Sequence, residues 1–178
     1  PDLNFGTTVI SRYTLRLLTT QQFERTAALI CSLELIRASY EGMLGRIPIS
    51  LGLWLGGGMT PNSIKKAEES LAELLNETKP HNNNPFILNV CPCCNTPFLP
   101  ETKREDAADY GFSIDGSALR MQCLDTSCPM AQGVPVIVID EQIYDELPTI
   151  VIGTIDKFAR LTWLEKAGWL LNGRGDSK

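Results

Sequence analysis

The stretch TIVIGTIDKF, residues 149–158, joins an apolar run directly to the start of a helical pattern. Residues 149–153 have the length and the branched side chains of a buried strand, and a helix is expected from Thr154 to about Leu171. A strand followed at once by a helix is the repeating unit of α/β proteins. This stretch therefore predicts one strand and one helix of an α/β domain.

The N-terminal part of the chain has the same arrangement. VISRYTLRLL, residues 9–18, reads as a strand, because branched and aromatic residues are interleaved with arginines. Thr19 or Thr20 can cap the long helix that follows, which we expect to end near residues 42–45. Cys31 lies in this helix among aliphatic residues, so it is interpreted as a buried core thiol.

Two further strands are predicted in the middle of the chain. IPISLGLWL, residues 47–55, is a short apolar run that ends at a glycine triplet, and a helix is expected from residues 60–63 to about Thr78. VPVIVI, residues 134–139, is the other strand, and a short helix or turn follows it over residues 140–147. The strand–helix alternation predicts a mainly parallel sheet with helices on both of its faces.

Residues 85–134 interrupt this alternation with short strands, frequent glycine and proline, and five of the six cysteines. A polar break at residues 79–85 precedes them and contains His81, the single histidine, for which we expect no role. We therefore predict a small β insert over residues 85–134, with residues 1–84 and 135–178 as the two parts of one α/β domain.

The cysteines of the insert have the spacing of metal ligands. Cys91 and Cys94 are two residues apart in CPCCN, and Cys123 and Cys128 have four residues between them in CLDTSCP. Four thiolates satisfy a closed tetrahedral zinc site, which stabilises a small fold and leaves no position for catalysis. A reduced core cluster or a redox pair is the alternative interpretation, and Cys93 is a spare thiol that could replace Cys94 only at an awkward spacing.

Composition limits the function classes. With 43% hydrophobic and 21% charged residues, the chain is typical of a globular domain, and no apolar stretch is long enough to span a membrane. A net charge of −5 argues against a wholly basic nucleic-acid binder, but a local basic groove is compatible with it. The absence of a leader and the cysteine pattern favour a cytoplasmic segment of a longer protein.

Few motifs in the sequence indicate catalysis or ligand binding by themselves. VIVIDE, residues 136–141, is similar to a Walker B strand, yet no phosphate loop with its lysine is present, so a strand that ends in a solvated acidic turn is favoured. We expect no catalytic residues. Residues 18–23 and 153–157 both end a strand with hydroxyls at a helix start, where backbone amides can receive phosphate oxygens.

These motifs, taken together, resemble the first RecA-like domain of superfamily-two helicases. LLTTQQF, the Gly57–Gly58 doublet and GTIDK occur in the order of that family's motif Ia, glycine doublet and motif Ib. Three segments are similar in sequence to the DrmA-like helicases of DISARM antiphage systems: YTLRLLTTQQFER, IPISLGLWLGGGMTPN and LPTIVIGTIDKFARL. The resemblance implies a partial RecA-like sheet with a zinc-ribbon-like insert, between motif I and motif II.

The same resemblance implies a function and a set of contacts. The parent protein would be an ATP-dependent DNA helicase or translocase that binds ATP and Mg²⁺ outside this segment, and a partner subunit of a defence complex is implied as well. Seven residues would contact the nucleic-acid backbone: Thr19, Thr20, Gln21, Gly57, Gly58, Thr154 and Lys157. The alternatives are a zinc-stabilised interaction module with no motor and, on the strength of Cys93 alone, a thiol or metal enzyme.

Overall fold

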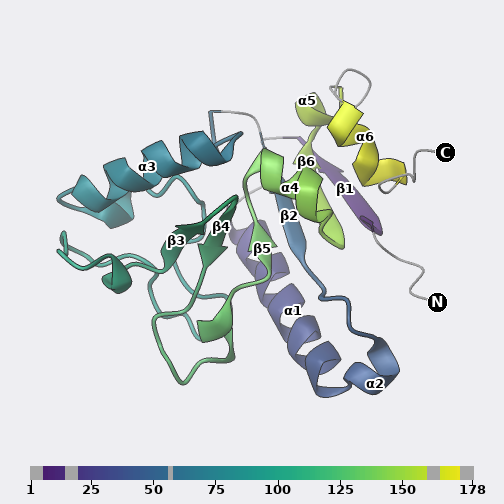
Figure 1. The fold of residues 1–178 in the computed structure, drawn as a ribbon, viewed down its shortest axis with the longest axis horizontal. Helices are drawn as coiled ribbons and strands as arrows, with labels where there is room; N and C mark the ends of the chain where they lie inside the picture. Colours follow the sequence, from purple (N-terminus) through teal and green to yellow (C-terminus); the bar gives the residue numbers. More distant parts are fainter. Residues whose placement is uncertain (1–5, 15–19, 56–57, 160–164, 173–178) are drawn as a thin grey trace.

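The parallel sheet at the centre of the protein has four strands. A computed structural model describes residues 6–14, 20–55, 58–159 and 165–172, and Figure 1 shows their arrangement. The strands are β1 (Val9–Tyr13), β2 (Leu51–Trp54), β5 (Val136–Ile137) and β6 (Ile150–Thr154), in the order β1-β6-β2-β5. β6 pairs with β1 on one side and with β2 on the other, and all these pairs are parallel.

Helices cover both faces of this sheet, as predicted. Alternate residues of a strand point to opposite faces, and Leu51, Leu53 and Ile152 share one buried cluster with side chains of α1 (Thr20–Ser39). On the other face, Trp54 and Val151 pack with α4 (Asp140–Glu146) and α6 (Glu165–Asn172). The α/β fold class is therefore confirmed.

The remaining elements are one longer helix, a hairpin and five short elements. α3 (Ile64–Asn76) begins at Ser63, whose hydroxyl accepts a hydrogen bond from the Lys66 amide. β3 (Phe112–Asp115) and β4 (Ala118–Met121) form an antiparallel hairpin. The short elements are three 3₁₀ turns and two helices of four residues: η1 (Pro80–Asn82), η2 (Ala107–Asp109), η3 (Pro129–Gln132), α2 (Glu41–Leu44) and α5 (Ile155–Phe158).

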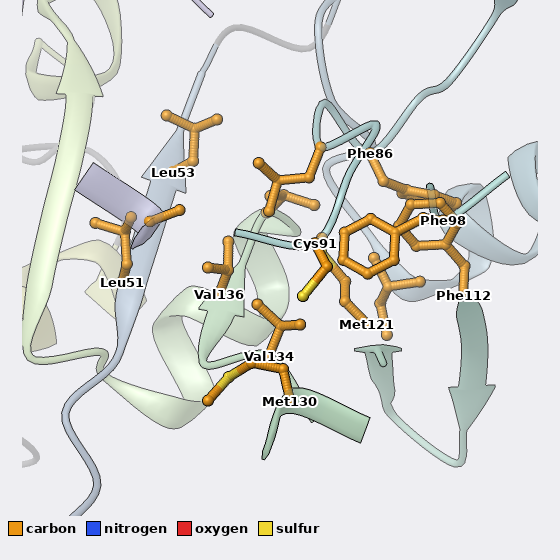
Figure 2. Close-up of a cluster of buried hydrophobic side chains, with 14 of the residues drawn as sticks. Leu51, Leu53, Phe86, Cys91, Phe98, Phe112, Met121, Met130, Val134 and Val136 are labelled. Atoms are coloured by element: carbon orange, nitrogen blue, oxygen red, sulfur yellow. The ribbon is translucent and has the colours of Figure 1, made fainter. Parts of the chain in front are cut away.

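The insert and the sheet share one core. Figure 2 shows side chains of the strands beside those that surround Cys91. One buried cluster contains Leu51, Leu53 and Val136 of the sheet and the following residues of the insert: Phe86, Cys91, Phe98, Phe112, Met121 and Met130. α3 contacts β3, β4 and η1, so this helix belongs spatially with the insert. The boundary at residue 84 stays a prediction.

Several elements are shorter than the sequence patterns predict. The expected strand at residues 9–18 is β1, five residues long, and residues 15–19 lie outside the described part. β5 pairs over only two residues, because the chain turns into α4 after Ile139, its N-cap. The helix expected from Thr154 onward is described as α5 and α6. No helix in the described ranges is both long and apolar enough to cross a membrane.

Candidate metal centre and carboxyl edge of the sheet

The four predicted ligands converge on one point. The Sγ atoms of Cys91, Cys94, Cys123 and Cys128 all lie within 4.8 Å of one another. Cys94 Sγ is 3.4 Å from Cys123 Sγ, and Cys91 Sγ is 3.9 Å from Cys128 Sγ. Since Zn–S bonds are about 2.3 Å long, the edges of a tetrahedral four-thiolate zinc site are about 3.8 Å. Both the donor set and its spacing fit a metal ion such as zinc.

A tight turn presents the first two thiols. The Cys91 amide donates to the Thr96 carbonyl over 2.8 Å, and the Asn95 amide donates to the Cys91 carbonyl over 2.9 Å. Asn95 has a left-handed φ of 64°. Asparagine tolerates this backbone conformation better than most residues. The turn therefore brings Cys91 and Cys94 to the same side.

Hydrogen bonds within the loop between Cys123 and Cys128 bring this more widely spaced pair together. The Cys128 amide donates to the Asp125 carbonyl over 3.0 Å, and the Asp125 carboxylate accepts bonds from the amide and the hydroxyl of Ser127. The Cys123 amide is bound to the Met130 carbonyl, also over 3.0 Å. These bonds fold the four intervening residues into a compact turn, so the unusual spacing still returns Cys128 to Cys123.

The pKa values of the four thiols are shifted in different directions. Burial raises the pKa of Cys91, Cys123 and Cys128 above the ordinary value. A hydrogen bond from the Thr96 side chain, whose Oγ1 is 3.1 Å from Cys94 Sγ, is the main reason that the pKa of Cys94 falls to about 6. Because metals bind thiolates, loading this site must displace protons from the three buried thiols.

The other cysteines and the histidine are not members of this group of four. Cys93 is exposed and does not belong to the group of four. Cys31 is buried in α1, and burial is the main cause that raises its pKa to about 12, as expected of a core thiol. His81 is exposed in η1. Within the described residues, the four cysteines are the one cluster of at least three potential ligand side chains.

In the sequence, the residues that the helicase resemblance assigns to nucleic acid come at or after the last residues of β1, β2 and β6. Parallel strands share one carboxyl edge, so those that the structure describes lie toward that edge. Thr19 and Gly57 lie outside the described residues, and Thr20 is the first residue of α1. Of the others, Gln21 and Gly58 are exposed, whereas Thr154 and Lys157 are buried.

Lys157 forms a buried ion pair that sequence reasoning missed. Its ammonium donates to the Asp140 carboxylate, and the two side chains are 5% and 8% exposed. The favoured interpretation of a solvated acidic turn was therefore wrong for Asp140. Glu141 is exposed, and its carboxylate accepts a 2.9 Å bond from the Ile64 amide at the start of α3. Contact of Lys157 with a phosphate would require the pair to open and stays a prediction.

Comparison with known proteins places the chain beside one defence protein. No protein-family model matches it. The DISARM protein DrmA of Bacillus paralicheniformis is 37% identical over 168 residues, which cover 93% of this chain. The chain spans only 15% of the length of that relative. It is therefore a distant homologue of a segment of a DrmA protein.

Proposed function

We propose that this chain is the segment of an ATP-dependent DNA helicase or translocase of antiphage defence that contacts the nucleic-acid backbone and contains a structural zinc ion. The observation that carries the proposal is the homology to a DrmA segment over nearly the whole chain. The helicase motifs named from the sequence and the parallel sheet are consistent with it. ATP and Mg²⁺ would be bound by other segments of such a protein.

The carboxyl edge of the sheet is the proposed DNA-contacting surface. In open α/β sheets, ligands bind beyond the carboxyl ends of the strands. α1 begins there, and the start of a helix favours negatively charged groups such as phosphate. Gln21 is exposed in this first turn. Contacts of this kind hold the DNA backbone without reading its sequence.

The proposed zinc ion has a structural task. Four thiolates leave no coordination position open for a substrate, so the ion would hold the two cysteine turns together rather than catalyse a reaction. Its stabilisation reaches the sheet, because Cys91 belongs to the same buried cluster as Leu51 and Val136. The metal would thereby fix the insert against the α/β part of a cytoplasmic enzyme that works with a partner subunit.

A zinc-stabilised interaction module is the second candidate function. The burial of Thr154 and the pairing of Lys157 with Asp140 favour it, because these two side chains are enclosed in the protein rather than presented to DNA. The net charge of −5 favours it as well. In that case the α/β part would be the scaffold, and the insert would bind a protein.

Binding to single-stranded DNA distinguishes these functions. Fluorescence anisotropy with a labelled oligonucleotide at low and moderate salt would compare the native chain with Gln21→Glu. The added carboxylate at the carboxyl edge should weaken binding about threefold to tenfold at low salt. Gln132→Glu is the matched control, because Gln132 is also exposed but precedes β5, at the amino edge. Lys157 is unsuitable for this test because its replacement breaks a buried pair.

Each outcome decides between the two candidates. Salt-sensitive binding that Gln21→Glu weakens and Gln132→Glu leaves unchanged would support the DNA-contacting segment. Equal weakening by the two variants would indicate nonspecific attraction and remove the support for the carboxyl edge. No binding at low salt by a folded, zinc-loaded chain would contradict the proposed contacts and favour the interaction module.

A further inference from the structure

The outward face of α1 contains no charged side chain over four turns. Between Thr26 and Tyr40 the charged residues are Glu34 and Arg37 alone, and both are engaged on the inner side. Arg37 Nε donates to Glu34 Oε2 over 2.8 Å, and the same oxygen accepts a 2.7 Å bond from the Ile49 amide. Arg37 is itself buried and also donates to the Gly45 carbonyl.

Large apolar side chains occupy that outward face instead. Leu29, Leu33, Ile36 and Tyr40 recur at helical spacing, and Met43 and Leu44 of α2 continue the row. These six residues, here called the α1 stripe, are between 37% and 85% exposed. The opposite side of α1 is already buried in the core through Phe23, Ala27 and Ile30. A helix that is apolar on both sides is normally covered on both sides.

Three hydroxyl groups on this helix are hydrogen-bonded to the helix backbone rather than dependent on water. The side chains of Thr26, Ser32 and Ser39 donate to the carbonyls four residues before them, at 2.9, 2.9 and 2.8 Å. A polar group that is already hydrogen-bonded costs much less to bury than an unpaired one. These three hydroxyls can therefore be removed from water with their hydrogen bonds intact.

We propose that the α1 stripe binds a second copy of this chain, with the two α1 helices antiparallel across a twofold axis near Leu33. This arrangement places Leu29 of each copy opposite Ile36 of its partner. Because the stripe contains no charge, two copies meet without like-charge repulsion, although each chain has a net charge of −5. A twofold interface of this kind uses the same surface on both copies.

The size of the stripe is sufficient for such a dimer. Six large side chains with these exposures present an apolar area on the order of 600 Å² per copy, which is at the upper end of the patches found on monomers. Neighbouring atoms of Ala28, Ser32 and Ser39 add to the contact, so the buried area approaches the roughly 800 Å² per partner of standard interfaces. The inference does not depend on the proposed DNA-contacting function.

The first test is the state of association of the folded chain in solution. Sedimentation velocity should find a dimer at about 100 µM, and Ile36→Glu should weaken the association at least tenfold because it buries an unpaired charge. Leu171→Glu is the matched control, since Leu171 is 60% exposed on α6, away from the stripe. Circular dichroism would verify that both variants are folded.

The second test combines two variants. Leu29→Lys alone should weaken the dimer as Ile36→Glu does, because each variant buries one unpaired charge. An equimolar mixture of the two should restore association, since the antiparallel arrangement pairs the ammonium introduced at position 29 of one chain with the carboxylate introduced at position 36 of the other. A parallel arrangement would give no rescue and would contradict the proposed geometry.

Three other results would overturn the proposal. One is a native chain that stays monomeric at about 100 µM. Another is equal weakening by Leu171→Glu. The third is a monomer that binds neutral phosphatidylcholine vesicles through the stripe, measured by flotation and lost in Ile36→Glu, which would identify a lipid surface as the occupant.

Discussion

The two faces of the parallel sheet are stabilised in different ways. On one face, α1 and the cysteine insert bury the larger cluster, which contains Leu51 and Leu53 of the sheet and Cys91 and Met121 of the insert (Figure 2). On the other face, Trp54 and Val151 are covered by α4 and α6, with no cysteine among the buried residues of the cluster. We call these the insert face and the helical face.

This difference between the two faces indicates which of them a bound metal would stabilise. On the insert face, the four-residue strands β3 and β4 and three 3₁₀ turns provide few long-range backbone bonds, so the proposed zinc ion must supply much of the order. The helical face has regular helices, a buried Trp54–Tyr144 hydrogen bond of 3.0 Å and, at the start of α4, the Asp140–Lys157 pair. We therefore expect the insert face to depend on metal and the helical face to be largely independent of it.

Removing the metal should have the largest effect and should be confined to the insert face. In zinc-finger peptides the ion contributes about 10–16 kcal/mol of apparent binding free energy. After chelation, or in Cys91→Ser, the amides of Cys91, Cys123 and Val134 should lose their protection from hydrogen exchange. The amides of Ile143 and Leu147, which are hydrogen-bonded within and at the end of α4, should keep theirs.

Hydrogen exchange followed by mass spectrometry measures both groups of amides in one experiment. Re-addition of zinc to the chelated native chain is the control, and it should restore the lost protection. If the two faces lost protection together, they would form a single cooperative unit. If neither lost it, the cysteine cluster would need no metal.

Breaking the buried ion pair should be the largest perturbation of the helical face. Asp140→Ala leaves the Lys157 ammonium buried without its partner, so the free energy of unfolding should fall by about 3–5 kcal/mol. Urea unfolding followed by tryptophan fluorescence measures this change. The double variant Asp140→Leu, Lys157→Met should recover most of the loss, because a well-packed apolar pair can replace buried charges.

Asp145→Ala is a matched control on the same helix. Asp145 pairs with Lys166 across 3.7 Å, and these side chains are 49% and 53% exposed. Loss of such a solvent-screened pair should cost less than about 1 kcal/mol. Similar losses in Asp140→Ala and Asp145→Ala would show that burial of the Asp140–Lys157 pair has no energetic consequence.

Tyr144→Phe should have a smaller effect on the helical face. The Tyr144 hydroxyl accepts the hydrogen bond of the Trp54 indole, and both side chains are buried. Its removal leaves the indole N–H without this acceptor, which should cost about 1–3 kcal/mol in urea unfolding. Tyr40→Phe removes a hydroxyl that is exposed in the single chain, so at a protein concentration well below that of the expected dimer it should change stability by less than about 0.5 kcal/mol. Equal effects of the two variants would contradict the assigned role of this bond.

The sequence predicted the features that depend on local patterns. Apolar runs of strand length located β2 and β6, and paired cysteines at short spacing predicted the convergence around Cys91. Apolar residues and thiolate ligands each impose a local periodicity or spacing that can be recognised without knowing the fold.

Features that depend on tertiary contacts were not predictable in this way. Asp140 and Lys157 are 17 positions apart and meet only because α4 and α5 both begin at the carboxyl edge. Gln142 is a second example, since its side-chain amide exchanges hydrogen bonds of 3.0 and 3.3 Å with the backbone of Leu119 and thereby joins α4 to the hairpin. No spacing rule identifies such partners, because the distance along the chain between them is arbitrary.

The smallest expected effect is that of Cys93→Ser, and it tests the ligand assignment most directly. Cys93 is exposed and outside the group of four thiols, so its replacement should leave one zinc ion per chain and change the free energy of unfolding by less than about 0.5 kcal/mol. Cys94→Ser, one position away, should greatly weaken zinc binding, because it replaces one of the four convergent thiol ligands by a hydroxyl. Titration with a zinc-selective dye measures both affinities. If Cys94→Ser kept full affinity while Cys93→Ser lost it, Cys93 would be the ligand, and the turn around Asn95 would have to present the adjacent thiol instead.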